Sequence, residues 1–402
     1  MELDCLQGMT RPYILLPPSS RRRLSRRVRR SVPPRRWPRL AAGLALATLC
    51  LLGAGTLHAA ADNGGQGLLP IGDQFPTKLL FLTFTPEPVS ALPAAKLDLA
   101  YQYSVANTVV NTQAAPLNGS PKITQAQVDA GLTAANFPAT GFGIFMDMET
   151  VRQLLRIRYG LGAGFEAGLD QAWVSFGGGG LDAYISQVEG SVHGENPERV
   201  ALDRNQFHYY VFHNGRALVA TSAPVGNVPQ DPVLSLKWNL TEGGELLPAI
   251  SLKLAYKAPL DSAQSVPRGL VSSGHDDVGY SLLVSKAIGK VVAHLQVGES
   301  QLSGTGRDYV SMLHHQFLGL EYRAGSRHSW IVQTSSQTSA FNVGNVPGTS
   351  SDFQTSRPAD VFTFGYKYGG DRFHMDLGFS EDYNSRDNTT DIVLFLDLGL
   401  KW

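Results

Sequence analysis

The last twelve residues, Asp391-Ile-Val-Leu-Phe-Leu-Asp-Leu-Gly-Leu-Lys-Trp402, carry Ile, Leu or Trp at every even position. The odd positions include Asp397, Gly399 and Lys401. Successive side chains of a β-strand point to opposite faces of the sheet. The segment is therefore predicted to form a strand with one continuous apolar face and one mixed face.

The same alternation recurs along the chain in runs of about ten residues. This length fits a tilted strand that crosses a membrane, whereas strands of soluble domains usually have five or six residues. A soluble β-sandwich also alternates, so run length matters for the choice. The predicted strands are 95–105, 146–159, 164–176, 231–240, 247–257, 278–287, 290–300, 312–324, 327–339, 360–368, 371–381 and 391–402.

Tight and long connections alternate between these runs. Turns of a few residues are expected near 161–164, 288–290 and 369–370, and long loops at 106–145 and 177–230. Short turns at one end and long loops at the other are typical of outer-membrane barrels. The fold class predicted is all-β: a transmembrane antiparallel up-and-down β-barrel of about twelve strands, with one short helix in a long extracellular loop. The count becomes fourteen if the hairpin at 205–222 also spans the membrane.

Composition and charge are uneven along the 402 residues. Residues 1–61 contain eleven Arg and two acids, whereas the rest carries 23 basic and 32 acidic groups, which disfavours a nucleic-acid partner. An Arg-rich stretch, the apolar run 40–53 and the small residues Ala59 and Ala61 predict a cleaved signal peptide over 1–61, with an uncleaved anchor as the alternative. We expect export to the outer membrane of a Gram-negative bacterium. The expected partners are outer-membrane lipid, the barrel-assembly machinery and a small-molecule solute.

The chain is predicted to consist of three segments with different roles. Residues 1–61 are the signal peptide, and residues 95–402 are the barrel. Residues 62–94 are expected to form an N-terminal periplasmic or plug segment, although 78–84 could add a strand. The closing residues Leu398, Leu400 and Trp402 resemble the recognition signal that barrels present for assembly.

The mixed face of the predicted strands is rich in ionisable residues that would line the lumen. Two interpretations stay open, a polar path that slightly prefers anions and a salt-bridged, packed interior. In either one, Glu166 and Asp170 could pair with a basic ladder on the preceding strand. The candidate lumen-lining residues are Arg152, Arg156, Arg158, Glu166, Asp170, Lys237, Lys253, Glu321, Arg323, Lys367, Arg372, Asp376 and Asp397.

A helical spacing of apolar residues follows a run of four glycines in the loop 177–230. Such a stripe predicts a short helix that either covers the barrel mouth as a lid or packs on neighbouring loops. The glycine run has no following Lys-Ser or Lys-Thr, so no phosphate-binding loop is expected. The stripe consists of Leu181, Tyr184, Ile185, Val188 and Val192.

No catalytic, cofactor or metal site is predicted. None of the ten His residues is followed two positions later by Ser, the spacing that would place base and nucleophile on one face of a strand. Both Cys, Cys5 and Cys50, lie in the predicted signal peptide, so no thiolate chemistry is expected in the mature chain.

Some local motifs suggest a family. They are Gly-Leu-Asp-Ala-Tyr-Ile at 180–185, the aromatic residues Phe207, Tyr209 and Tyr210, and Asp-Asn-Thr-Thr-Asp at 387–391. In these the chain resembles the Gram-negative envelope family called domain of unknown function 3187. The resemblance implies a barrel and brings no established activity or site residues.

Three functional hypotheses follow, in order of preference. The first is a passive channel or transporter for small molecules. The second is a non-conducting barrel that acts through its long loops, in a structural or surface-interaction role. The third is an outer-membrane hydrolase, which ranks last because no nucleophile and base lie in register.

Overall fold

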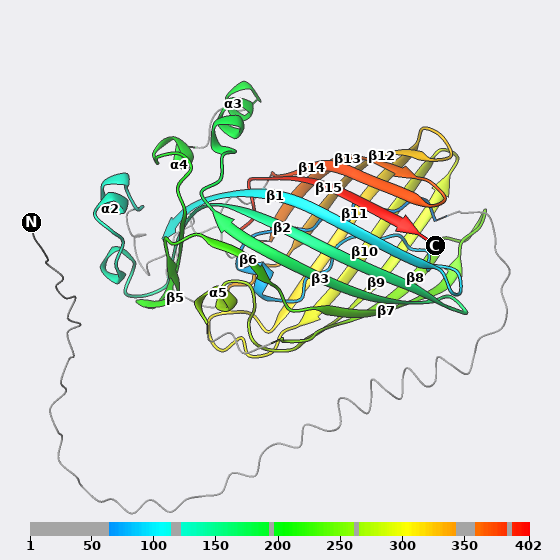
Figure 1. Ribbon diagram of the computed structural model, residues 1–402, viewed down its shortest axis with the longest axis horizontal. Helices are drawn as coiled ribbons and strands as arrows, with labels where there is room; N and C mark the ends of the chain where they lie inside the picture. The colour runs from blue at the N-terminus through cyan, green and yellow to red at the C-terminus, as the bar shows by residue number, and fades with distance from the viewer. Residues whose placement is uncertain (1–63, 114–121, 193–196, 261–264, 343–357, 384–387) are drawn as a thin grey trace, which may run out of the picture. The chain divides into compact units, whose positions relative to one another are not determined.

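A closed antiparallel barrel forms the body of the protein in the computed structural model, which describes residues 64–402 except 114–121, 193–196, 261–264, 343–357 and 384–387. Twelve strands pair with their neighbours in sequence around the wall, and the last pairs with the first (Figure 1). They are β1 (Leu97–Gln113), β2 (Phe142–Gly162), β3 (Phe165–Gly177), β7 (Val233–Glu242), β8 (Ala249–Lys257), β9 (Asp277–Ile288), β10 (Val291–Gln301), β11 (Met312–Arg323), β12 (His328–Gln337), β13 (Ala359–Gly369), β14 (Phe373–Asp382) and β15 (Ile392–Lys401).

Burial along the strands is the reverse of that in a water-soluble protein. In β8, Lys253 and Lys257 are buried, whereas Leu252 and Leu254 are 42% and 46% exposed. Lysine is almost never fully buried without a partner, and exposed leucines in a row need an apolar surrounding. A hydrocarbon exterior and a polar interior satisfy both, and a closed sheet leaves no unpaired backbone edge in it. The predicted fold class and strand number are confirmed.

Two ends of the barrel differ in their connections. At the end that we call the short-turn end, β2–β3, β7–β8, β9–β10, β11–β12 and β13–β14 are joined by two to six residues. In the turn between β9 and β10, Gly289 takes a φ of 61°, a conformation that favours glycine. The opposite end, which we call the long-loop end, carries all the other connections (Figure 1, left).

Three further strands lie at the long-loop end. β4 (His208–His213) and β5 (Arg216–Thr221) form a hairpin whose turn contains Asn214 and Gly215 at φ 51° and 71°. β4 pairs with the first six residues of β2, beyond the part of β2 that pairs with β3. The hairpin therefore extends the wall outwards without adding to the twelve strands. β6 (Val225–Pro229) pairs with the end of β3 and was not expected from the sequence.

The expected loop at 106–145 is shorter than predicted, because β1 continues to Gln113 and β2 begins at Phe142. Both faces of these extensions are covered, so apolar and polar residues no longer alternate. On the outer face, Phe145 and Phe212 pack against Phe137 of the loop between β1 and β2.

The helices are short. They are η1 (Lys78–Leu80), α2 (Gln125–Asp129), η2 (Ala134–Asn136), α3 (Asp182–Val192), α4 (Pro197–Val200) and α5 (Val266–Gly269). Of the helices in the described ranges, none combines the length and the hydropathy that a membrane crossing requires.

Residues 64–96, which we call the plug segment, run through the inside of the barrel before β1 begins (Figure 1, blue). Leu68, Leu69 and Phe84 pack against Phe317 and Phe395 of the inner wall. The segment contains no strand, so 78–84 does not join the sheet and instead includes the single turn η1. The predicted signal peptide, residues 1–61, lies outside the described residues.

Glycines in the wall make room for the plug segment on one side of the barrel. A Cβ at Gly319 of β11 would lie 2.5 Å from Leu68, and a Cβ at Gly365 of β13 would lie 2.9 Å from Leu69. A glycine inside a strand weakens it and often marks a close approach of another chain segment. The plug segment is thus fitted closely against the wall from β9 to β13.

Candidate functional site: the lumen of the barrel

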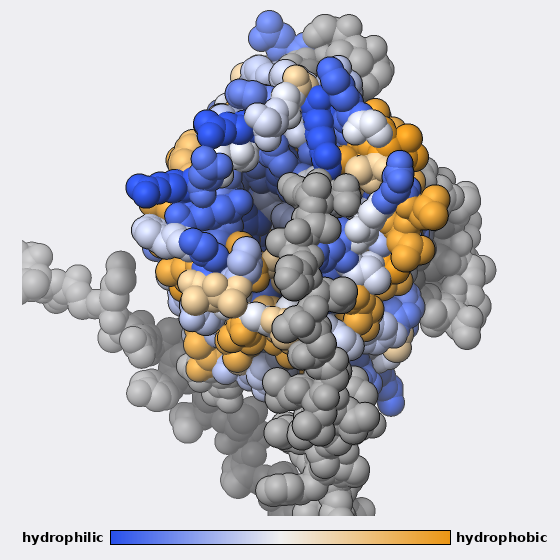
Figure 2. Space-filling model, turned by 90° about the vertical axis from the view of Figure 1, so that its right-hand side faces the viewer, coloured by the Kyte–Doolittle hydropathy of each residue, from blue (hydrophilic) through white to orange (hydrophobic). Residues whose placement is uncertain are grey.

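A cavity of about 590 Å³ opens at the short-turn end, between the plug segment and the strands β13, β14, β15, β1, β2, β3 and β7. Figure 2 looks onto this end and shows a hollow bordered by hydrophilic residues, with hydrophobic residues at the periphery. We call this cavity the vestibule. The plug segment lines it with Gly65, Gln66, Leu68, Pro70, Glu87, Pro88 and residues 90–93.

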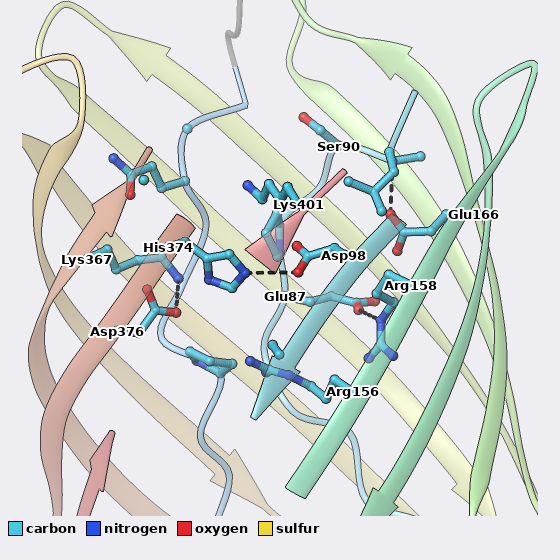
Figure 3. A pocket seen from close by; sticks show the side chains of 18 of the residues that line it. Glu87, Ser90, Asp98, Arg156, Arg158, Glu166, Lys367, His374, Asp376 and Lys401 are labelled. Atoms are coloured by element: carbon cyan, nitrogen blue, oxygen red, sulfur yellow. Dashed lines mark hydrogen bonds and ion pairs between the residues drawn. The ribbon is translucent and has the colours of Figure 1, made fainter. Parts of the chain in front are cut away.

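Ion pairs surround the vestibule (Figure 3). Lys367 Nζ lies 2.7 Å from Asp376 Oδ2, and His374 Nε2 lies 3.0 Å from Asp98 Oδ1. Arg156 pairs with Asp397 across β1. The walls are therefore strongly polar, although their opposite charges are largely matched.

Several buried cations of the wall bind the plug segment. Lys253 Nζ lies 3.0 Å from Glu87 Oε1, and Arg158 Nε lies 3.9 Å from the other oxygen of the same carboxylate. Lys237 and Lys367 donate to the carbonyl oxygens of Pro88 and Leu68, each over 3.1 Å. These lysines neutralise carboxylates. They also donate to carbonyl groups of a segment that contains no strand, and burial would otherwise leave these carbonyl groups unsatisfied.

Carboxylate and amide side chains of the opposite wall accept from the plug backbone. Glu321 accepts from the Gln66 N–H over 2.9 Å, and Gln333 accepts from the Leu69 N–H over 2.8 Å. Glu321 is fully buried and also binds His294 at 3.0 Å and Ser329 at 2.7 Å. Such a fully satisfied buried network fixes the start of the plug segment against β11 and β12.

The middle of the lumen retains two small cavities of about 60 and 50 Å³. Both lie between the plug segment and the β2, β3, β7 and β8 side of the wall, and both are lined by Arg152, Leu154 and Asp170. Arg152 donates through Nε to Gln230 Oε1 over 2.9 Å. The plug segment thus leaves space beside β2, β3, β7 and β8 and fills the lumen beside the wall from β9 to β13.

An apolar cluster closes the lumen at the long-loop end. Phe75 and Leu79 of the plug segment pack there with inward-facing residues of β2, β3 and β4, among them Phe142, Phe176 and Tyr209. Leu270, Val271 and Phe341 join the cluster from the loops. The interior therefore changes from charged at the short-turn end to apolar at the long-loop end.

The predicted lumen residues lie mostly on the inner face. Asp170 pairs with Arg158 at 2.5 Å, whereas Glu166 pairs with Lys237 of β7 at 3.0 Å and not with the ladder of β2. Two residues differ from the prediction in position. Arg372 precedes β14 and has an exposed side chain, because the strand begins only at Phe373. Arg323 ends β11 and is 27% exposed at the short-turn end.

The predicted lid residues belong to α3 and to the residue before it. Ile185 is 3% exposed and Leu181 is half-buried, but Tyr184 is 53% exposed, so these three do not form one buried stripe. The side chains of Val188 and Val192 lie outside the described part of the chain. Glu149 of β2 accepts from the backbone of Gly180 at the start of this segment over 2.7 Å. A lid role stays a prediction.

A buried polar network holds the α3–α4 segment to the barrel rim. Arg199 donates to Asp182 over 2.6 Å and to Asn107 over 2.9 Å, and it also pairs with Asp391. Asp182 and Asp391 belong to two of the three motifs quoted above for the family resemblance, and Arg199 brings them together. Sequence reasoning had not selected Arg199, because one Arg in a long loop gives no spacing signal.

Charged residues of the plug segment were also missed. Glu87 binds two wall cations, and Lys78 pairs with Asp73 at 2.5 Å inside the lumen. No alternation marks residues 64–96, so their partners could not be read from the sequence. In the described residues, no group of three or more His, Cys, Asp or Glu has the arrangement of a metal site.

The outward-facing terminal residues form part of the apolar exterior. Leu398, Leu400 and Trp402 are 39%, 47% and 55% exposed. The Trp402 N–H donates to Leu97 O over 2.9 Å and so extends the seam between β15 and β1 to the last residue.

Comparison with known proteins identifies the family of this chain. A family model described as "Protein of unknown function (DUF3187)" matches residues 44–402, so the family resemblance noted in the sequence is confirmed. No curated protein matches the chain.

Three solved structures are distantly similar. An outer membrane channel (COG4313) from Pseudomonas putida F1 has 12% identity and a TM-score of 0.46, with 78% of this chain and 98% of that chain covered. The NanC porin has 9% identity and a TM-score of 0.38 over 76% and 100% of the two chains. The toluene transporter TodX of Pseudomonas putida has 11% identity and a TM-score of 0.35 over 77% and 89%.

Proposed function

We propose that this chain, which belongs to the DUF3187 family, is an outer-membrane channel for small solutes that its own plug segment holds closed. The observation that carries the proposal is the plug segment inside a closed barrel whose exterior is apolar. A barrel with a purely structural role needs no polar vestibule, whereas a channel needs one where a solute enters.

The plug segment is held too strongly to leave the barrel as a whole. Fully burying one large apolar side chain is worth about 1.5–3 kcal/mol, so ten of them give more than about 15 kcal/mol. The ten are Leu68, Leu69, Ile71, Phe75, Leu79, Leu80, Phe81, Leu82, Phe84 and Val89.

Opening is therefore expected to be local. Residues 86–93, Pro-Glu-Pro-Val-Ser-Ala-Leu-Pro, border the vestibule and bury one large apolar side chain, Val89. Their attachments are the ion pairs of Glu87 and backbone contacts such as Lys237 to Pro88. We infer that displacement of this short stretch connects the vestibule with the two cavities beside Arg152 as the first step of opening. The apolar cluster at the long-loop end must separate as well before a solute can cross.

Conductance in planar lipid bilayers tests the proposal. The mature chain is expected to give rare and small conductance events. A variant that lacks residues 64–94 is expected to give steady channels of at least several-fold larger conductance, because water then fills the polar lumen.

The matched control replaces residues 125–136 by a Gly-Ser linker of equal length, since these residues cover only the outer face at the long-loop end. It should behave like the intact chain. Far-UV circular dichroism in detergent must show the same strand content for all three proteins. A folded variant without residues 64–94 that stays silent contradicts the proposal.

A second candidate function rests on the long-loop end. There the network of Arg199 and the β4–β5 hairpin build an ordered surface beyond the barrel wall. This supports a role in surface interaction, and deletion of residues 208–221 with retained conductance but lost surface binding would favour it.

A further inference from the structure

Arg152 differs from the other buried cations of the lumen in its partners. Arg156, Arg158, Lys237, Lys253, Lys257 and Lys367 each form an ion pair with a carboxylate. Arg152 forms none within the described residues, and its side chain hydrogen bond goes to the neutral Gln230. Its guanidinium carries a charge that the surrounding protein leaves without an opposite partner.

The carboxylates nearest to the two cavities are already matched. Asp170 binds Arg158, Asp73 binds Lys78, and Asp231 binds Arg268 at 2.6 Å. Asp170 lies close enough to act on Arg152 through space. None of the three carboxylates provides the paired hydrogen bonds that a guanidinium makes best. An unpaired buried charge is expensive, so such a site favours an anion that enters it.

The surroundings of Arg152 favour an organic anion over an inorganic one. The larger cavity is bordered by Leu79, Leu82, Leu154 and Val233, and the smaller by Phe81 and Val271. A carboxylate group can accept two parallel hydrogen bonds from the free end of the guanidinium, and a short apolar tail would meet these side chains. Volumes of about 60 and 50 Å³ limit the tail to a few carbon atoms.

Two further arginines of β2 lie between this point and the short-turn end, each paired with a carboxylate. Arg158 and Arg156 line the vestibule, and Arg152 follows on the same face of β2, six residues or about 20 Å from Arg158 along the strand. We propose that Arg152 forms the binding site for a short-chain carboxylate in the middle of the lumen. The role of this site in permeation rests on the proposed channel function, whereas binding itself does not.

Equilibrium dialysis with ¹⁴C-acetate and the full mature chain in detergent micelles tests the site. The wild-type protein is expected to bind one acetate per chain. Arg152→Gln should weaken binding at least tenfold, and Arg152→Lys should retain part of it because the cation remains. Methylammonium, a cation of similar size, should not bind.

Arg323→Gln serves as the matched control, because Arg323 lies at the short-turn end away from both cavities. It should bind acetate like the wild type. If Arg152→Gln fails to fold, the affinity of Arg152→Lys relative to the Arg323→Gln control still tests the site. Equal acetate affinity in wild type and in a folded Arg152 variant, or no saturable binding in the wild type, overturns the proposal. A barrel that binds acetate but never conducts would contradict the channel function and support the binding site. A barrel that conducts but does not bind acetate would contradict the binding site and support the channel function.

Discussion

The ion pair between Glu87 and Lys253 gives the sharpest test of how the plug segment is held. Both side chains are nearly buried, at 10% and 6% exposure, and their charged atoms lie 3.0 Å apart. Glu87→Gln leaves Lys253 without a carboxylate, and Lys253→Met leaves Glu87 with the guanidinium of Arg158 at 3.9 Å. The double variant removes both charges.

The expected magnitudes follow from the geometry. Two unit charges 3.0 Å apart attract by about 5 kcal/mol at an effective dielectric constant of 20. Loss of one partner of a buried pair costs about 3–5 kcal/mol, because the other charge stays buried. We expect Glu87→Gln to reach this range and Lys253→Met its lower end. The loss of unfolding free energy in the double variant should be smaller than the sum of the two single losses by about 3 kcal/mol, which is the coupling between the two side chains.

Urea unfolding in detergent micelles, followed by tryptophan fluorescence, measures these free energies. The matched control is the pair Arg327–Asp371, which has a similar separation of 3.1 Å but is 51% and 88% exposed. Exposed pairs couple by at most about 1 kcal/mol. Additive losses at Glu87 and Lys253, or equal coupling in the two pairs, would refute the interpretation that buried charges hold the plug segment.

Four further predictions concern other parts of the barrel. Gly319→Ala should destabilise the protein by about 1–3 kcal/mol in the same unfolding assay, because the new methyl group would meet Leu68, whereas Gly177→Ala has open space and should change little. Arg199→Met should expose the segment 178–205 to protease and to hydrogen exchange while the barrel stays folded, because it leaves two buried carboxylates without this cation; unchanged protection would contradict this. Burial would raise the pKa of Asp308, but hydrogen bonds from His213 and Arg216 outweigh burial and hold that pKa below its ordinary value of about 3.9. The contribution of Asp308 to stability is therefore present above its unfolded pKa and is lost as the pH falls through its lowered folded pKa. The protection of the β4–β5 hairpin against hydrogen exchange, taken relative to the intrinsic rate at each pH, should therefore fall between pH 4 and pH 2, and an Asp308→Asn variant should lack this step. Trp402→Ala should reduce the yield of assembled barrel in cells with little effect on refolding in detergent, and equal yields would argue against an assembly signal.

Alternation was sufficient to predict the barrel wall. Each of the twelve predicted strands coincides with an observed one, and the best match is β8, where buried and more exposed residues alternate without a break. Alternation does not mark a strand where both of its faces are covered. In β1, the residues Val109 and Val110 are both buried, on opposite faces, so no alternation remained to extend the strand to Gln113.

The content of the lumen could not be predicted in the same way. The inward direction of Lys253 follows from the period of two, but its partner Glu87 lies 166 positions earlier in a segment without regular structure. Pairs across neighbouring strands, such as Glu166 with Lys237, depend on register, which sequence spacing leaves open by two or more residues. The position of Arg152 could therefore be foreseen, whereas its lack of a carboxylate partner could not.

The glycine-fitted plug segment has a consequence for the order of assembly. The segment precedes β1 in the chain, and the wall closes only when β15 joins β1 along a seam that runs from Trp402 to Asn107. If the barrel closed first, the ten buried apolar side chains of the plug segment would have to enter through an opening lined with charged residues. In the intact chain the sheet therefore closes around a core that is already in place, and the part of the barrel that is synthesised first acts as the template for the rest. Without residues 64–94 the same sheet would close around water.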